Sequence, residues 1–68
     1  MDKFITFKGW VFNTRYIISM CKNERNVTGM IEYSIELQTT NNTFRQWFDS
    51  ESERDMVFNQ LSKDFLNE

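Results

Sequence analysis

The stretch MIEYSIELQ, residues 30–38, decides the fold. Polar side chains separate apolar ones that recur at every second position, namely Ile31, Tyr33, Ile35 and Leu37. Because successive side chains of a strand point to opposite faces, this pattern predicts a strand with one apolar side and one polar side. The apolar side needs a cover, and the segment best suited to provide it lies near the C-terminus.

That C-terminal segment has apolar residues at helical spacing, namely Val57, Phe58, Leu61 and Phe65, with Leu66 at the margin of the stripe. Ser50 and Glu53 fit a capping box, in which each side chain binds the free backbone N–H of the other residue. Acidic residues crowd the first turn, where the helix dipole favours negative charge. The sequence therefore predicts a helix over residues 50–66. Its stripe packs on strand 30–39, and Arg54 faces elsewhere.

Two further strands precede this pair, at residues 3–12 and 16–21, where aromatic and β-branched side chains are frequent. Gly9 interrupts the first of them, and we expect a bulge or a strong bend at Lys8-Gly9. Without a bulge, Val11 would share a face with Ile5 and Phe7. With one, that face would be joined by Trp10 and Phe12.

The remaining connections are a polar loop at residues 22–29 and a tight turn at residues 40–43, which leads into a strand at 44–48. The predicted fold class is α+β: a four-stranded antiparallel meander followed by one C-terminal helix packed on one face, in the order ββββα. At 68 residues the chain is expected to form one domain, 1–68.

Composition argues against catalysis and against a cofactor. The chain has no His and one cysteine, Cys21, so neither a Cys/His metal site nor an imidazole base is available. Two glycines are too few for a phosphate-binding loop of the usual kinds. We therefore expect no enzyme, no metal and no cofactor. Without a signal-peptide pattern or a membrane span, a cytoplasmic location is expected.

Charge and coding bias give weaker indications. Residues 1–48 carry six basic and four acidic residues, a balance of +2, whereas residues 49–68 carry two basic and six acidic residues, a balance of −4. The chain lacks Pro and Ala and is rich in Asn, Ile, Lys and Phe. This bias is typical of AT-rich coding, and it favours an accessory protein of a low-GC bacterium, a phage or a mobile element.

The second face of the predicted sheet is the candidate site. One helix covers one face, which leaves aromatic and aliphatic side chains on the other, and such a patch on a small protein indicates an interface. We expect a protein partner, a second copy first, and no membrane. The alternative is that sheet curvature rolls these residues into the core. The candidate binding residues are Trp10, Tyr16, Ile18, Met20, Arg45 and Trp47.

Nucleic acid is the alternative partner. A four-stranded sheet with a trailing helix, used as a dimer, resembles in architecture the PC4-like single-strand-binding proteins. That resemblance implies Trp10, Tyr16 and Trp47 as stacking residues. It implies as phosphate contacts Lys8, Arg15, Lys22, Arg25 and Arg45. Separately, the strand-to-helix ending Phe-Asp-Ser-Glu, residues 48–51, resembles the close of small pleckstrin-homology-like domains.

Overall fold

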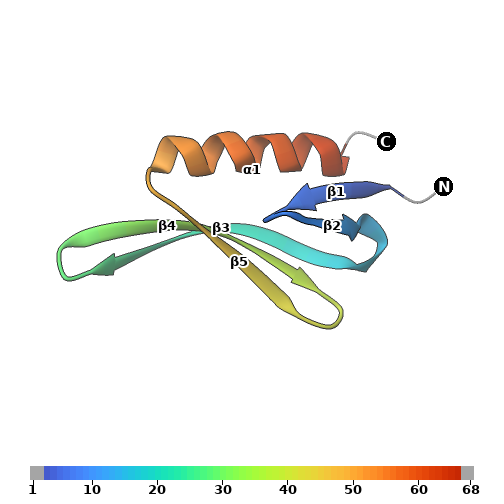
Figure 1. Ribbon diagram of the computed structural model, residues 1–68, viewed down its shortest axis with the longest axis horizontal. Helices are drawn as coiled ribbons and strands as arrows, with labels where there is room; N and C mark the ends of the chain where they lie inside the picture. Colours follow the sequence, from blue (N-terminus) through green and yellow to red (C-terminus); the bar gives the residue numbers. More distant parts are fainter. Residues whose placement is uncertain (1–2, 67–68) are drawn as a thin grey trace.

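The computed structural model describes residues 3–66, which form five strands, a short 3-10 helix and one α-helix (Figure 1). The elements in chain order are β1 (Phe4–Phe7), β2 (Trp10–Asn13), η1 (Thr14–Tyr16), β3 (Ile17–Val27), β4 (Met30–Thr39), β5 (Thr43–Phe48) and α1 (Glu51–Leu66).

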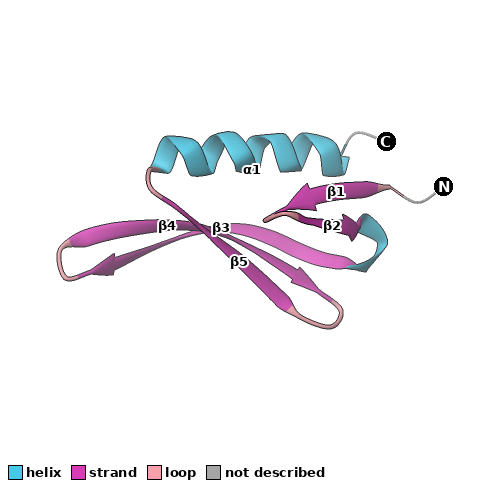
Figure 2. Ribbon diagram, viewed as in Figure 1, coloured by secondary structure: helices cyan, strands magenta, loops and turns pink. Residues whose placement is uncertain are grey.

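The strands make two antiparallel sheets, β1-β2 and β3-β4-β5 (Figure 2). The predicted α+β class, with one C-terminal helix on an antiparallel sheet, is confirmed. The four strands expected in one meander are instead five strands in two sheets. The β1-β2 hairpin and α1 lie on the same side of the three-stranded sheet (Figure 1).

The division arises at Lys8-Gly9, where we expected a bulge or a bend and the chain makes a tight hairpin turn. Both residues have positive φ, 58° and 77°, the backbone that two-residue hairpin turns require. The turn pairs Ile5 with Phe12 and Phe7 with Trp10, so all four residues share one face. The prediction of a bulge was wrong, whereas the alternative of a strong bend is present as this turn, and it groups the side chains as a bulge would have done.

The second difference concerns residues 22–29, which we expected to be a loop. β3 continues to Val27, and a second turn with positive φ at Thr28 and Gly29 leads directly into β4. The polar composition of residues 22–27 gave no indication of a strand. The reason is that the outer half of β3 extends beyond the part of the sheet that α1 covers (Figure 1). Cross-strand pairing with β4, from Lys22↔Ile35 to Val27↔Met30, holds the extension in place.

A register shift between Ile17 and Ser19 changes the faces predicted for the start of β3. The alternation of residues 16–21 in the sequence predicts Tyr16, Ile18 and Met20 on one side of the strand and Ile17 on the other. The irregularity instead turns both Ile17 and Met20 toward the core, and leaves Ile18 61% exposed. Single-residue alternation cannot anticipate such a shift.

The core lies between the three-stranded sheet on one side and α1 with the β1-β2 hairpin on the other. Ile35 and Leu37 of β4 are fully buried, as the alternation in residues 30–38 predicts. Leu61 is buried against them, and the predicted stripe residues Val57, Phe58 and Phe65 also pack on the core. β1 contacts α1, and β2 contacts β5 through the rings of Phe12 and Phe44, whose centres lie 4.9 Å apart.

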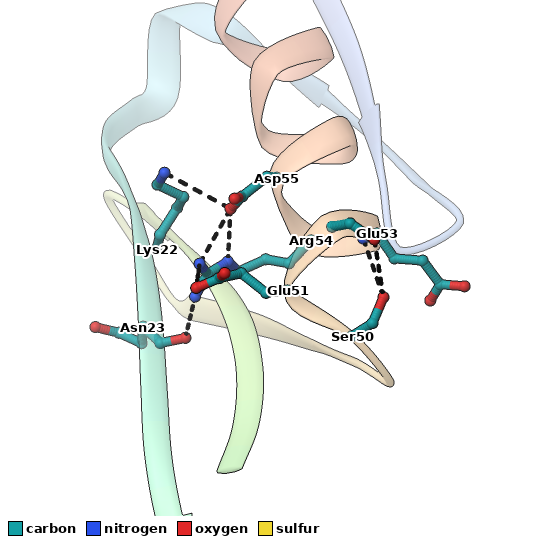
Figure 3. A network of polar contacts seen from close by, with 8 residues as sticks. Lys22, Asn23, Ser50, Glu51, Glu53, Arg54 and Asp55 are labelled. Carbon is teal, nitrogen blue, oxygen red and sulfur yellow. Dashed lines mark hydrogen bonds and ion pairs between the residues drawn. The ribbon is translucent and has the colours of Figure 1, made fainter.

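Arg54 is the main correction to the predicted helix, because it faces the sheet and is only 4% exposed. Its Nη1 donates to the carbonyl oxygen of Asn23 at 2.9 Å, and its Nε donates to Asp55 Oδ1 at 3.1 Å (Figure 3). Its Nη2 lies 3.6 Å from Glu51 Oε2. At the start of the same helix the Glu53 N–H donates to Ser50 Oγ at 3.2 Å, as expected for a capping serine.

Candidate functional site

The face of the β3-β4-β5 sheet that points away from α1, hereafter the open face, is not covered by any element within residues 3–66 (Figure 1). Cross-strand register arranges its central side chains in three rows. The rows are Arg25–Glu32, then Asn23–Ser34–Trp47, then Cys21–Glu36–Arg45. Each row runs across the strands, so side chains distant in sequence become immediate neighbours.

Trp47 lies between two arginines on this face. The guanidinium carbon of Arg25 is 4.6 Å from the centre of the indole, and that of Arg45 is 5.6 Å from it. Both distances are within the range of a cation–π contact, which is strongest with tryptophan. The indole remains 43% exposed, so a partner can still reach it.

Each of these arginines also binds a carboxylate on β4. Arg25 donates from Nη2 and Nε to Glu32 Oε1, at 2.6 and 3.1 Å, and Arg45 donates from Nη2 to Glu36 Oε2. We call Arg25, Glu32, Glu36, Arg45 and Trp47 the Trp47 cluster. With two positive and two negative groups, the cluster has no net charge.

Ser34 is at the centre of the cluster, in register between Asn23 and Trp47, and it is only 1% exposed. The alternation of residues 30–38 predicts that it would face solvent, and it does lie on the open face. Its burial follows from its size, because larger side chains surround this small one. A small residue here lets a flat indole lie close to the sheet.

The structure separates the six candidate binding residues. Arg45 and Trp47 share the open face, as the alternation of strand 44–48 predicts. Trp10 is 62% exposed on the β1-β2 hairpin, with its ring 6.4 Å from that of Phe44 on the opposite side of the sheet. Tyr16 lies in η1, and both Ile18 and Met20 line a shallow groove between β3 and the C-terminal half of α1.

The sequence did not indicate Glu32 and Glu36 as parts of the site, and it indicated Arg25 only as a phosphate contact in the nucleic-acid alternative. Glu32 and Glu36 were recognised as polar positions of a strand, but their partners depend on register. Arg25 fell in the segment expected to be a loop. The sequence does contain one indication of this pairing. Arg25 and Glu32 lie seven residues apart with Thr28-Gly29 midway between them, which is the spacing expected if a hairpin turn brings the two side chains together.

Among residues 3–66, no three His, Cys, Asp or Glu side chains are grouped as metal ligands would be. Within the same residues no helix has the length and apolar character needed to cross a membrane. Comparisons with protein-family models, with curated proteins and with solved structures found no match for this chain.

Proposed function

We propose that this chain is a small, non-catalytic binding module whose open face binds protein, and that its partner is a second copy of the chain. The Trp47 cluster is the observation that supports this proposal. Tryptophan and arginine are, with tyrosine, the residue types most enriched among energetically dominant interface contacts. Here one Trp and two Arg lie at the centre of an uncovered sheet face.

The charge of the cluster favours protein over nucleic acid. A surface that binds phosphates needs uncompensated cations, since affinity for nucleic acid comes largely from neutralising phosphates. Arg25 and Arg45 are each bound to a carboxylate, which would lie against the phosphates and repel them. A partner with an equally balanced surface would meet no such repulsion.

The pattern of charge is also complementary to itself. Strands lie about 4.8 Å apart, and side chains on one face repeat about every 6.8 Å along a strand. A two-fold axis that lies in the plane of the face and passes through Ser34 relates the two copies in this arrangement. At one end of the cluster the axis passes between Arg25 and Glu32, and at the other end it passes between Glu36 and Arg45. Each arginine of one copy thereby meets the equivalent carboxylate of the other copy.

This arrangement crosses the strands of the two copies at about 40°, close to the angle of about 30° at which packed sheets usually align. It sets Trp47 of one copy against Asn23 and Cys21 of the other. Ten residues of β4 and three strand spacings give a face of about 30 by 15 Å. About 500 Å² per copy is at the low end for specific interfaces, so we expect weak, reversible association.

Light scattering across a range of protein concentrations tests the proposal. The mean mass should rise from that of one 8.3 kDa chain toward twice that value. Trp47→Ala should abolish the rise, and Trp10→Ala, which removes an exposed indole from the other side of the sheet, should leave it intact. Cys21 lies on the open face, so its exposed thiol should react with a maleimide more slowly as the protein concentration rises and dimers cover it. A mass independent of concentration would refute self-association.

Single-stranded nucleic acid is the second candidate partner, and the cation–π stack around Trp47 is the observation in its favour. Titration with an oligonucleotide at two salt concentrations separates the two candidates. Tight binding that weakens steeply with salt and quenches tryptophan fluorescence would establish the nucleic-acid function. Equal fluorescence with and without the oligonucleotide would eliminate it.

A further inference from the structure

A second surface lies on the helix side of the sheet, where the end of β5 approaches the first half of α1. The two elements enclose a groove of about 350 Å³, hereafter the β5/α1 groove. It is lined by Gln46, Trp47, Phe48, Asp49, Glu53, Met56 and Val57. The β1-β2 hairpin fills the corresponding space at the other end of β5, where Phe12 contacts Phe44.

One wall of the groove is an unpaired strand edge. β5 pairs with β4 along one side, and within residues 3–66 no strand pairs with its other side. An edge of this kind presents free backbone donors and acceptors, to which an extended peptide can add as a further strand. In this mode of recognition the main chain supplies affinity and neighbouring side chains select the sequence.

The side chains of the groove define what the added strand would carry. Phe48, Met56 and Val57 are apolar, and Met56 is largely exposed although it has no polar group. Asp49 and Glu53 are the charged lining residues. No lysine or arginine is among the described residues that line the groove, so the local charge is negative. An acidic, partly apolar groove is complementary to a segment with both basic and apolar side chains.

We propose that the β5/α1 groove binds an extended cationic peptide segment, which adds as a strand to the free edge of β5. Side chains alternate along a strand, so every second residue of the added strand faces α1. Apolar residues at these positions contact Met56 and Val57, and basic residues at these positions reach Asp49 and Glu53. This site is independent of self-association through the open face. Trp47 borders both surfaces, and the test therefore leaves it unchanged.

Fluorescence anisotropy with a labelled acetyl-Lys-Thr-Val-Thr-Lys-Thr-Val-amide peptide, whose lysines and valines share one face of a strand, tests the site on the full chain. We expect saturable binding that Asp49→Asn with Glu53→Gln weakens about tenfold, since each exposed charge pair contributes up to about fivefold. Glutamine also serves in a capping box, so Glu53→Gln preserves the start of α1. The matched control, Glu24→Gln with Asp64→Asn, changes the net charge equally outside the groove and should bind as the wild type does.

A second peptide distinguishes strand addition from simple charge attraction. The same sequence with N-methyl groups on alternate backbone nitrogens keeps every side chain and loses the donors that a new strand needs. It should bind at least tenfold more weakly. Absence of binding, equal binding by both double variants, or equal binding of the methylated peptide would each overturn the proposal. None of these results would alter the concentration dependence of the mass, which tests the open face alone.

Discussion

Arg54 connects α1 to the sheet through a charged group that is almost fully buried. Its guanidinium binds the Asn23 carbonyl on β3 and Asp55 on its own helix, and it lies 5.2 Å from the centre of the Tyr33 ring. Asp55 also lies 3.6 Å from the Nζ of Lys22, which extends the network back to β3 (Figure 3). A planar group with five donors suits this position better than any ammonium could.

Arg54→Met tests how much the polar network contributes. Methionine fills much of the same volume but leaves the Asn23 carbonyl without its donor, so we expect a loss of about 2 kcal/mol in unfolding free energy. For a chain of this size that loss lowers Tm by roughly 10 °C. Thermal unfolding followed by circular dichroism measures it. Lys63→Met, an exposed change on the same helix, is the control, and equal Tm values for the two variants would contradict the account.

The burial of Arg54 also shows where residue-level prediction stops. The helical spacing of Phe58, Leu61 and Phe65 extends backward to position 54, so periodicity alone favours an inward side chain there. Its charge was the reason to place it outward. Burial of a charge depends on partners, and here one partner is a backbone carbonyl on a strand that was expected to be a loop.

At the scale of elements, the β3-β4 hairpin determines both the shape of the molecule and the composition of the open face. Its turn places Thr28 at φ 49° and Gly29 at φ 84°. A β-branched residue is rare at positive φ, and asparagine is preferred at the first position of such a turn. The Asn26 side chain accepts a hydrogen bond from the Gly29 N–H at 3.2 Å, which stabilises the turn.

Replacement of Thr28 should therefore stabilise the protein. Thr28→Asn relieves part of the backbone strain, and we expect a gain of about 1 kcal/mol, or about 5 °C in Tm. Gly29→Ala should act in the opposite direction by a similar amount. A Cβ at Gly29 would meet no atom within 4 Å, so strain alone causes the loss. Chemical denaturation measures both variants, and a Thr28→Asn protein no more stable than the wild type would contradict the turn conformation.

Prediction from sequence succeeded for elements whose burial produces a regular pattern. β4, α1 and β5 alternate or repeat at the period of their structure, because one side of each faces the core. Predictions from the sequence pattern were wrong at Lys8-Gly9, in the outer half of β3 and at the Ile17–Ser19 irregularity. At each of these places cross-strand pairing or turn geometry decides the structure, and neither leaves a period in the sequence.

At the scale of the whole molecule, the structure is elongated, with principal extents of 46 × 24 × 18 Å. The helix and the β1-β2 hairpin occupy one side of the three-stranded sheet, and the Trp47 cluster occupies the other. The sequence predicted the uncovered face and two of its residues, Arg45 and Trp47. The balance of charge on that face could not be predicted, because it depends on the register that brings Arg25 beside Glu32.

Charge reversal tests this central claim most directly. One variant, Arg25→Glu with Arg45→Glu, makes the cluster entirely acidic, and another, Glu32→Arg with Glu36→Arg, makes it entirely basic. These pairs are exposed and contribute little to folding, so both variants should remain folded by circular dichroism. Across the proposed two-fold axis, like charges would meet in each variant alone and opposite charges would meet in the mixture.

The decisive measurement is the mean mass by light scattering of each variant alone and of their equimolar mixture. We predict single chains for each variant alone and dimers for the mixture. Arg15→Glu with Lys63→Glu carries the same net charge as the acidic variant but keeps the wild-type open face, so it should form dimers when it is measured alone. Variants that associate alone as the wild type does, or a mixture that contains only single chains, would contradict self-association through the open face.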